Sequence, residues 1–208
     1  MSIVSPISKR KDEHIQINLD KDVRSGVDAG FDSLAFDHQA LPEIDLADVD
    51  LQCGFFGKRL NAPILISSMT GGTELAQQIN TNLAIAANSA NIAMGVGSQR
   101  PAINDPATAA TFNVRKVAPN IFLFANIGAI QLNNGLSIDD CKKAIDMIGA
   151  DALFLHLNPL QEAVQHGGDT NWKGLRWKIE QVCKVMRVPV FAKEVGHGIS
   201  EKAARILV

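Results

Sequence analysis

The sequence lacks the features that define several large classes of protein. Its 208 residues carry a formal charge of only −2, so it has no basic surface of the kind that nucleic-acid binders need. No apolar run approaches the roughly 18 residues of a membrane span, and the first eleven residues lack the apolar core of a signal peptide. Its three cysteines are far apart, which argues against a disulfide framework or a zinc site. We therefore expect a globular protein of the cytoplasm.

What the sequence does contain is a regular alternation of short apolar segments and helical patterns. Buried strands are predicted at 62–67, 91–96, 120–127, 152–157 and 189–195. Helices are predicted over 75–90, from Asp105-Pro106, from the Ser137–Asp140 capping box to Gly149, over 171–187, and from Ser200 onward. Parallel strands need crossovers of about this length, so the alternation predicts an α/β protein with a parallel sheet.

The strand ends favour a barrel over a doubly wound sheet. No GxGxxG motif follows the first predicted strand, which weakens a dinucleotide-binding arrangement. Polar groups follow all five strands, as expected where every strand of a TIM (β/α)8 barrel opens at one mouth. A complete barrel has eight units, so we expect an N-terminal extension, 1–61, and the first five units, 62–208, of a truncated barrel. Ser8 would cap a short charged helix in the extension, and 31–50 is a candidate lid.

Most strand ends carry groups that could bind a ligand, and each also has a simpler structural explanation. The segment Ser67–Gly72 either lets backbone approach a flat or anionic ligand or forms a tight turn. Ser98 and Arg100 suit phosphate oxygens or lie in an exposed loop. Asn126 is either a ligand contact or a turn former. Lys193 needs an anionic partner, in a ligand or in a neighbouring carboxylate.

The densest group of polar residues follows the fourth strand. His156, Asn158, Gln161 and Glu162 fall within seven positions. A single histidine is commonly a core residue with its hydrogen bonds satisfied, but four polar groups after one buried strand are harder to explain in that way. Glu162 could bind Mg²⁺, which takes one or two carboxylates together with phosphates and water. Pro159 is expected to end the strand and lead the chain into a loop.

Near the N-terminus, Arg10, Lys11 and His14 could close over a diphosphate, although alone they would be interpreted as a solvated charged surface. Together with the strand ends, they make the sequence resemble the type 2, flavin-dependent isopentenyl-diphosphate isomerase family. The resemblance rests on the segments 10–14 (RKDEH), 69–72 (MTGG), 97–100 (GSQR), Asn126, 156–162 (HLNPLQE) and 193–196 (KEVG).

The resemblance implies an enzyme of isoprenoid biosynthesis that interconverts isopentenyl and dimethylallyl diphosphate, with FMN, Mg²⁺ and NADPH as the flavin reductant. It implies that FMN contacts Ser68, Met69, Thr70, Ser98, Asn126 and Lys193. It implies that the substrate contacts Arg10, Lys11, His14, Ser98, Gln99, Arg100, Asn158 and Gln161. Gln161 and His156 would be the catalytic residues, and Glu162 would hold the metal. A full-length protein of this family would be a homo-oligomer.

The family's glycine-rich segments for the FMN phosphate lie beyond residue 208. We therefore expect residues 1–208 alone to bind FMN weakly and to be inactive. Two alternatives stay open: a barrel related to the FMN-dependent 2-hydroxy-acid oxidases and dehydrogenases, and a partial barrel that only binds other molecules. The Arg10-Lys11 pair and Glu162 favour a diphosphate substrate over a small carboxylate.

Overall fold

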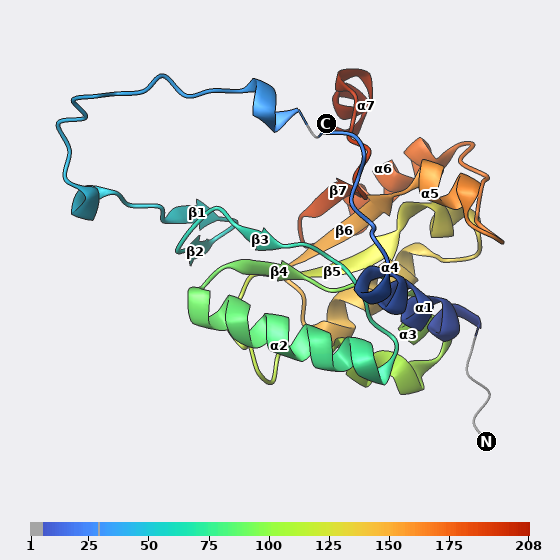
Figure 1. Cartoon of the computed structure of the whole chain (residues 1–208). Coiled ribbons are helices and arrows are strands. Elements are labelled where there is room, and N and C mark those ends of the chain that lie inside the picture. The colour runs from blue at the N-terminus through green and yellow to red at the C-terminus, as the bar shows by residue number, and fades with distance from the viewer. Residues whose placement is uncertain (1–5, 29) are drawn as a thin grey trace.

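The centre of the molecule is a five-stranded parallel sheet that curls into part of a barrel (Figure 1). The computed structural model describes residues 6–28 and 30–208, with side chains from Lys11 onward. Successive strands are neighbours, and they are β3 (Leu65–Ile66), β4 (Ala93–Gly95), β5 (Leu123–Gly128), β6 (Ala152–Leu157) and β7 (Val190–Glu194). The predicted partial α/β barrel is confirmed, with all five predicted strands present and the first two shorter than expected.

Helices connect the strands. In chain order they are α2 (Glu74–Ala90), α3 (Arg100–Asn104), the 3-10 helices η3 (Pro106–Phe112) and η4 (Ala129–Asn133), α4 (Ile138–Ile148), α5 (Pro159–Val164), α6 (Leu175–Val185) and α7 (Glu201–Leu207). The predicted capping box of α4 is present: the Ser137 hydroxyl accepts from the Asp140 backbone N–H, and the Asp140 carboxylate accepts from that of Ser137. Gly149 ends this helix in the left-handed conformation, as predicted.

Several local expectations were wrong. Pro159 does not lead into a loop, because it occupies the first turn of α5, where its missing N–H costs no helical hydrogen bond. The helix predicted over 171–187 starts only at Leu175, after Gly174 at φ 72°. The predicted helix start at Asp105-Pro106 is present, with Asp105 as the cap that accepts from the Ala107 N–H, but the helix that follows is a 3-10 helix. The N-terminal helix α1 (Pro6–Asp20) begins before Ser8, so Ser8 is inside the helix and is not its cap.

The two faces of the sheet have different partners because side chains alternate along each strand. On β5, Leu123, Ala125 and Ile127 belong to the large core that also contains residues of α2, α4 and α6. Phe122 and Phe124 lie on the other face, in a second core with Phe154 of β6. This second core lies on the inner, concave side of the partial barrel.

A β-hairpin that the sequence analysis did not predict covers the amino end of this inner core. Its strands β1 (Cys53–Phe55) and β2 (Lys58–Leu60) pair antiparallel. The Phe55 ring lies edge-on against Phe122, with 4.8 Å between ring centroids. The hairpin therefore places aromatic side chains where the barrel would otherwise be open at its amino end.

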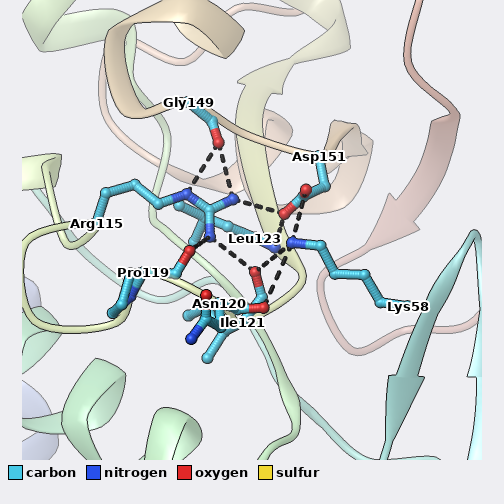
Figure 2. Close-up of polar contacts among 8 residues, drawn as sticks. All are labelled: Lys58, Arg115, Pro119, Asn120, Ile121, Leu123, Gly149 and Asp151. Atoms are coloured by element: carbon cyan, nitrogen blue, oxygen red, sulfur yellow. Dashed lines mark hydrogen bonds and ion pairs between the residues drawn. The ribbon is translucent and has the colours of Figure 1, made fainter.

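A group of charged residues joins the hairpin to the amino ends of β5 and β6 (Figure 2). The Asp151 carboxylate pairs with Lys58 at 2.8 Å and with Arg115, and it accepts from the Leu123 backbone N–H at 2.9 Å. Arg115 also donates to the Gly149 carbonyl at the end of α4. Burial alone would raise the pKa of Asp151, but hydrogen bonds from Lys58, Leu123 and Arg115 outweigh it and lower the pKa.

The segment between α1 and β1 arcs away from the sheet (Figure 1). Its described residues contain two short 3-10 helices, η1 (Phe31–Ser33) and η2 (Leu46–Asp48), and large apolar side chains among them, including Phe36, are exposed. The lid role of 31–50 stays a prediction. Within the ranges that the structure describes, no helix is both long and apolar enough to cross a bilayer.

The charged group at Asp151 predicts a specific stability effect. Asp151→Asn keeps the size of the side chain but leaves Arg115 and Lys58, both partly buried, without their carboxylate. We expect a loss of about 2 kcal/mol in the free energy of unfolding, measured by urea titration. The control is Glu180→Gln, which breaks an exposed ion pair with Lys184 and should change the free energy of unfolding very little. Equal effects of the two substitutions would contradict the role of Asp151.

Candidate functional site

A cavity of about 960 Å³ lies at the carboxyl ends of the strands, the edge where α/β barrels bind their ligands. Side chains from the ends of β5, β6 and β7, from the segments that follow β3 and β4, and from α1 and α2 surround it. The residues predicted from sequence that line it are Lys11, His14, Ser68, Met69, Thr70, Ser98, Asn126, His156, Gln161 and Lys193. The strand-end residues chosen for chemistry thus largely meet in one hollow.

Three of these residues form a row on the concave face of the sheet. Strand register sets His156 beside Lys193 on β6 and β7, and Asn126 comes from β5. The imidazole Nδ1 of His156 lies 2.8 Å from Asn126 Oδ1. Lys193 Nζ donates to the Glu194 backbone carbonyl at 3.0 Å. Phe124, Phe154 and Phe191 come two residues earlier on the same strands. The polar row therefore lies on a layer of aromatic rings.

The aromatic layer and the enclosed position disfavour charge in this row. Burial, followed by the positive charges of Lys193 and Lys11, lowers the pKa of His156 to about 4. Burial also lowers the pKa of Lys193, while Glu194 opposes that shift. At neutral pH the row therefore combines the neutral imidazole of His156 with the partly desolvated ammonium group of Lys193. An ammonium in such a position favours an anionic or electron-rich ligand.

The loop after β3 has geometry that suits a flat polar ligand. The Ser68 hydroxyl is buried at the cavity and has no hydrogen-bond partner among the described residues, which is uncommon for a buried polar group. Gly97 lets this loop pack closely, because a Cβ there would meet the Thr70 carbonyl oxygen at 2.3 Å. With Lys193 and Thr70 also at the cavity, these groups fit the polar edge of a flavin ring.

Helix α1 covers one side of the cavity. Lys11 Nζ donates to the Ser98 carbonyl at 3.0 Å and lies 5.2 Å from the centre of the Phe112 ring. His14 also lines the cavity. The side chain of Arg10 lies outside the described part of the chain, so its predicted role is untested.

Beside the cavity lies a second polar group, formed by residues that sequence analysis expected at the diphosphate. Arg100 does not line the cavity but pairs with Asp169 at 3.0 Å, and Gln131 donates to the same carboxylate oxygen at 2.8 Å. The Asp169 backbone N–H in turn donates to Glu162 at 2.7 Å. We call Arg100, Asp169, Gln131 and Glu162 the rim network. The bond to Asp169 holds one guanidinium nitrogen of Arg100 and so keeps the guanidinium group at the edge of the cavity.

Glu162 is buried, and its carboxylate already accepts hydrogen bonds from Asn158 Nδ2, Gln165 Nε2 and the Asp169 backbone. Asn158 Nδ2 also donates to Gln161 Oε1, which connects the rim network to the cavity. The side-chain oxygen of Asn158 is buried and has no partner among the described residues. No cluster of three or more His, Cys, Asp or Glu side chains suited to a metal occurs in the described ranges. One carboxylate fits Mg²⁺ only where substrate phosphate and water supply the other ligands.

Gln99 faces away from the cavity. Its side chain is fully buried, donates to the Ala144 carbonyl of α4 at 2.8 Å, and accepts from the Asn126 backbone N–H at 3.0 Å. In this structure Gln99 therefore supports Asn126 from the outer side of the sheet, and its predicted substrate contact stays a prediction. Sequence analysis missed Asp169 and Gln131. An acidic residue between glycines and a helix gives no local signal, since the pairing with Arg100 spans 69 residues.

The chain is similar in sequence to proteins of known name over most of its length. A protein from Rickettsia bellii named isopentenyl-diphosphate delta-isomerase is 53% identical to the chain over 197 residues, which is 95% of this chain and 58% of that protein. Proteins of the same name from Nostoc sp. and Synechocystis sp. are 53% and 54% identical over 96% and 95% of this chain. The chain is homologous to isopentenyl-diphosphate delta-isomerases. It spans 57–58% of the length of these homologues. No protein-family profile matches the chain.

Among solved structures, a mandelate oxidase variant with an FMN adduct resembles the chain with a TM-score of 0.51 and 17% identity, over 77% of this chain and 48% of that protein. This likeness supports the α/β barrel fold alone. The homology to the isomerases is therefore the finding that bears on chemistry.

The partly buried His156 predicts acid sensitivity. The unfolded chain takes up a proton on this imidazole as the pH falls below 6.5, whereas the folded protein does so only near pH 4. The free energy of unfolding should therefore decrease between pH 6.5 and 4, by on the order of 3 kcal/mol from this group. His156→Gln should remove that part of the decrease in urea titrations at several pH values, and His166→Gln, at an exposed position, should not. Parallel pH profiles for the wild type and His156→Gln would refute the assignment.

Proposed function

We propose that this chain supplies the flavin-ring and substrate-binding parts of a type 2, FMN-dependent isopentenyl-diphosphate isomerase. The protein would interconvert isopentenyl and dimethylallyl diphosphate in the isoprenoid biosynthesis of the cytoplasm, as a homo-oligomer, with Mg²⁺ and with NADPH as flavin reductant. The observation that carries the proposal is the single cavity lined by His156, Gln161, Asn126 and Lys193 in a chain 53–54% identical to proteins of that name.

The FMN ring would be held by Ser68, Met69, Thr70, Ser98, Asn126 and Lys193. When bound, reduced flavin supplies the proton transfers that move a double bond. The side chains at the cavity suit orientation rather than acid chemistry, because His156 is neutral and Gln161 has no ionisable group. Lys193 would place a positive charge beside the ring, and the unpartnered Ser68 hydroxyl would gain a hydrogen-bond partner. Gln161 and His156 would position the reacting carbon atoms.

The diphosphate would bind toward α1 and the rim network. Arg100 offers a guanidinium held by Asp169, Lys11 approaches from α1, and Arg10 is proposed as a further contact on the grounds of the sequence alone. His14, Ser98 and Asn158 complete the predicted substrate contacts, whereas Gln99 would have to leave its hydrogen bonds to Ala144 and Asn126 to join them. Glu162 would contribute its carboxylate to Mg²⁺ as the phosphate oxygens supply further ligands.

A chimera tests the proposed function. In this chimera, residues 1–208 replace the matching part of the Rickettsia bellii relative. Purified with FMN, reduced anaerobically with NADPH and supplied with Mg²⁺, it should convert isopentenyl diphosphate to dimethylallyl diphosphate, followed by chromatography of the labelled products. Glu162→Gln in the chimera should lower activity and shift its dependence on Mg²⁺.

A folded chimera that binds flavin but leaves isopentenyl diphosphate unchanged would overturn the proposal. Oxidation of lactate or glycolate by the same sample would instead support the 2-hydroxy-acid oxidase alternative. A chimera that stays colourless and inert toward all three substrates would support the non-catalytic binding module.

The rim network predicts a selective effect on substrate affinity. Asp169→Asn removes the charge that orients Arg100, so KM for isopentenyl diphosphate should rise about tenfold while kcat changes little. Steady-state kinetics of the chimera measure both constants, with the exposed Asp139→Asn as control. A fall in kcat at constant KM would show that Asp169 does not act through binding of the diphosphate.

A further inference from the structure

The side chain of Asn126 has a fixed orientation. It is 3% exposed, and its Nδ2 donates to the Val96 carbonyl oxygen at 3.1 Å. A flipped amide would set its oxygen against that carbonyl, leaving two acceptors facing each other. The backbone of Asn126 is fixed as well, since its N–H donates to Gln99 Oε1 and its carbonyl accepts from the Gln99 N–H at 2.9 Å.

The fixed amide determines which nitrogen of His156 carries the proton. Asn126 Oδ1 can only accept, and it lies 2.8 Å from His156 Nδ1, so Nδ1 must be the N–H. In a neutral imidazole the other nitrogen, Nε2, then has a free lone pair. No donor in the described part of the chain is bonded to Nε2, which lies beside Gly128, 3.0 Å from the point that a Cβ at Gly128 would occupy.

The charges around the ring disfavour a second proton on it. Lys193 on β7 and Lys11 on α1 both act on the imidazole through their positive charges. The face below the ring is the aromatic layer of Phe124, Phe154 and Phe191. In these surroundings the imidazole of His156 is neutral when a ligand binds.

We propose that Asn126 is a positioning residue that holds His156 in the Nδ1–H tautomer and so presents Nε2 to the cavity as a hydrogen-bond acceptor. The ligand of this cavity must then offer an N–H or O–H group at that point. This inference concerns the chain itself. Only its consequence for catalysis rests on the proposed isomerase function: His156 accepts a hydrogen bond from the bound molecule and does not supply the proton that the alkene gains.

Nuclear magnetic resonance of the 208-residue chain tests the inference without any ligand. Long-range ¹H–¹⁵N correlation spectra at pH 7 distinguish the two neutral tautomers of each histidine, and His156→Gln identifies the signals of His156. We expect a single Nδ1–H tautomer for His156 that persists at pH 5. The exposed His14, His38, His166 and His197 serve as references in the same spectra. An Nε2–H tautomer or a charged ring at pH 7 would overturn the proposal.

Two variants separate positioning from general damage to the fold. Asn126→Asp keeps an acceptor at Nδ1 and adds a negative charge, so His156 should stay Nδ1–H but become charged at a higher pH than in the wild type. Asn126→Ala removes the acceptor and should give a mixture of tautomers. Asn80→Ala, at another buried asparagine that donates to the Thr70 and Thr111 carbonyls, should leave His156 unchanged. If Asn126→Asp does not alter the titration of His156, the positioning role is wrong.

Discussion

The two-residue alternation of side chains on the concave face of the sheet is the constraint on which the site depends. On β5 it sets Phe124 and then Asn126 toward the inside, and on β6 it sets Phe154 and then His156. Register aligns Phe154 with Phe191 and His156 with Lys193, while β5 is offset by two residues, with Asn126 paired to Phe154. Across this offset Phe124 still stacks on Phe154 and Asn126 still contacts His156, so one aromatic layer lies under one polar layer. A slip of one residue in any strand would turn its polar group toward the helices and its aliphatic neighbour into the cavity.

The two ends of the partial barrel use polar groups in opposite ways. At the amino end, Lys58 and Arg115 both donate to the Asp151 carboxylate and to the Ile121 backbone carbonyl, which closes that end together with the hairpin. At the carboxyl end, Ser68 Oγ and Asn158 Oδ1 are buried without partners among the described residues. Because leaving a buried polar group unpaired costs about 1–3 kcal/mol, the carboxyl end retains binding capacity that the folded chain does not use itself.

The fold could be predicted from sequence where the signal is local, and so could much of the site. Apolar runs, capping residues and glycines gave five strands in the right order, and polar residues after the strands marked the cavity. The hairpin at Cys53–Leu60 was missed because its strands are three residues each and its aromatic contacts are with residues far along the chain. The orientation of Gln99 and the partnership of Arg100 with Asp169 were missed for the same reason: each is decided by tertiary contacts.

The cavity and the rim network also differ in how far their ionisable side chains are buried. Inside the cavity, burial moves His156 and Lys193 toward their neutral forms, conditions that suit an aromatic ring with polar edges. In the rim network, Arg100 and Asp169 form an ion pair with a quarter or more of each side chain exposed, so the guanidinium keeps part of its hydration. A ligand with an apolar part and a strongly anionic end would bind across both regions at a lower desolvation cost than a small carboxylate placed wholly inside the cavity. The arrangement of charge is thus compatible with the diphosphate ester proposed above.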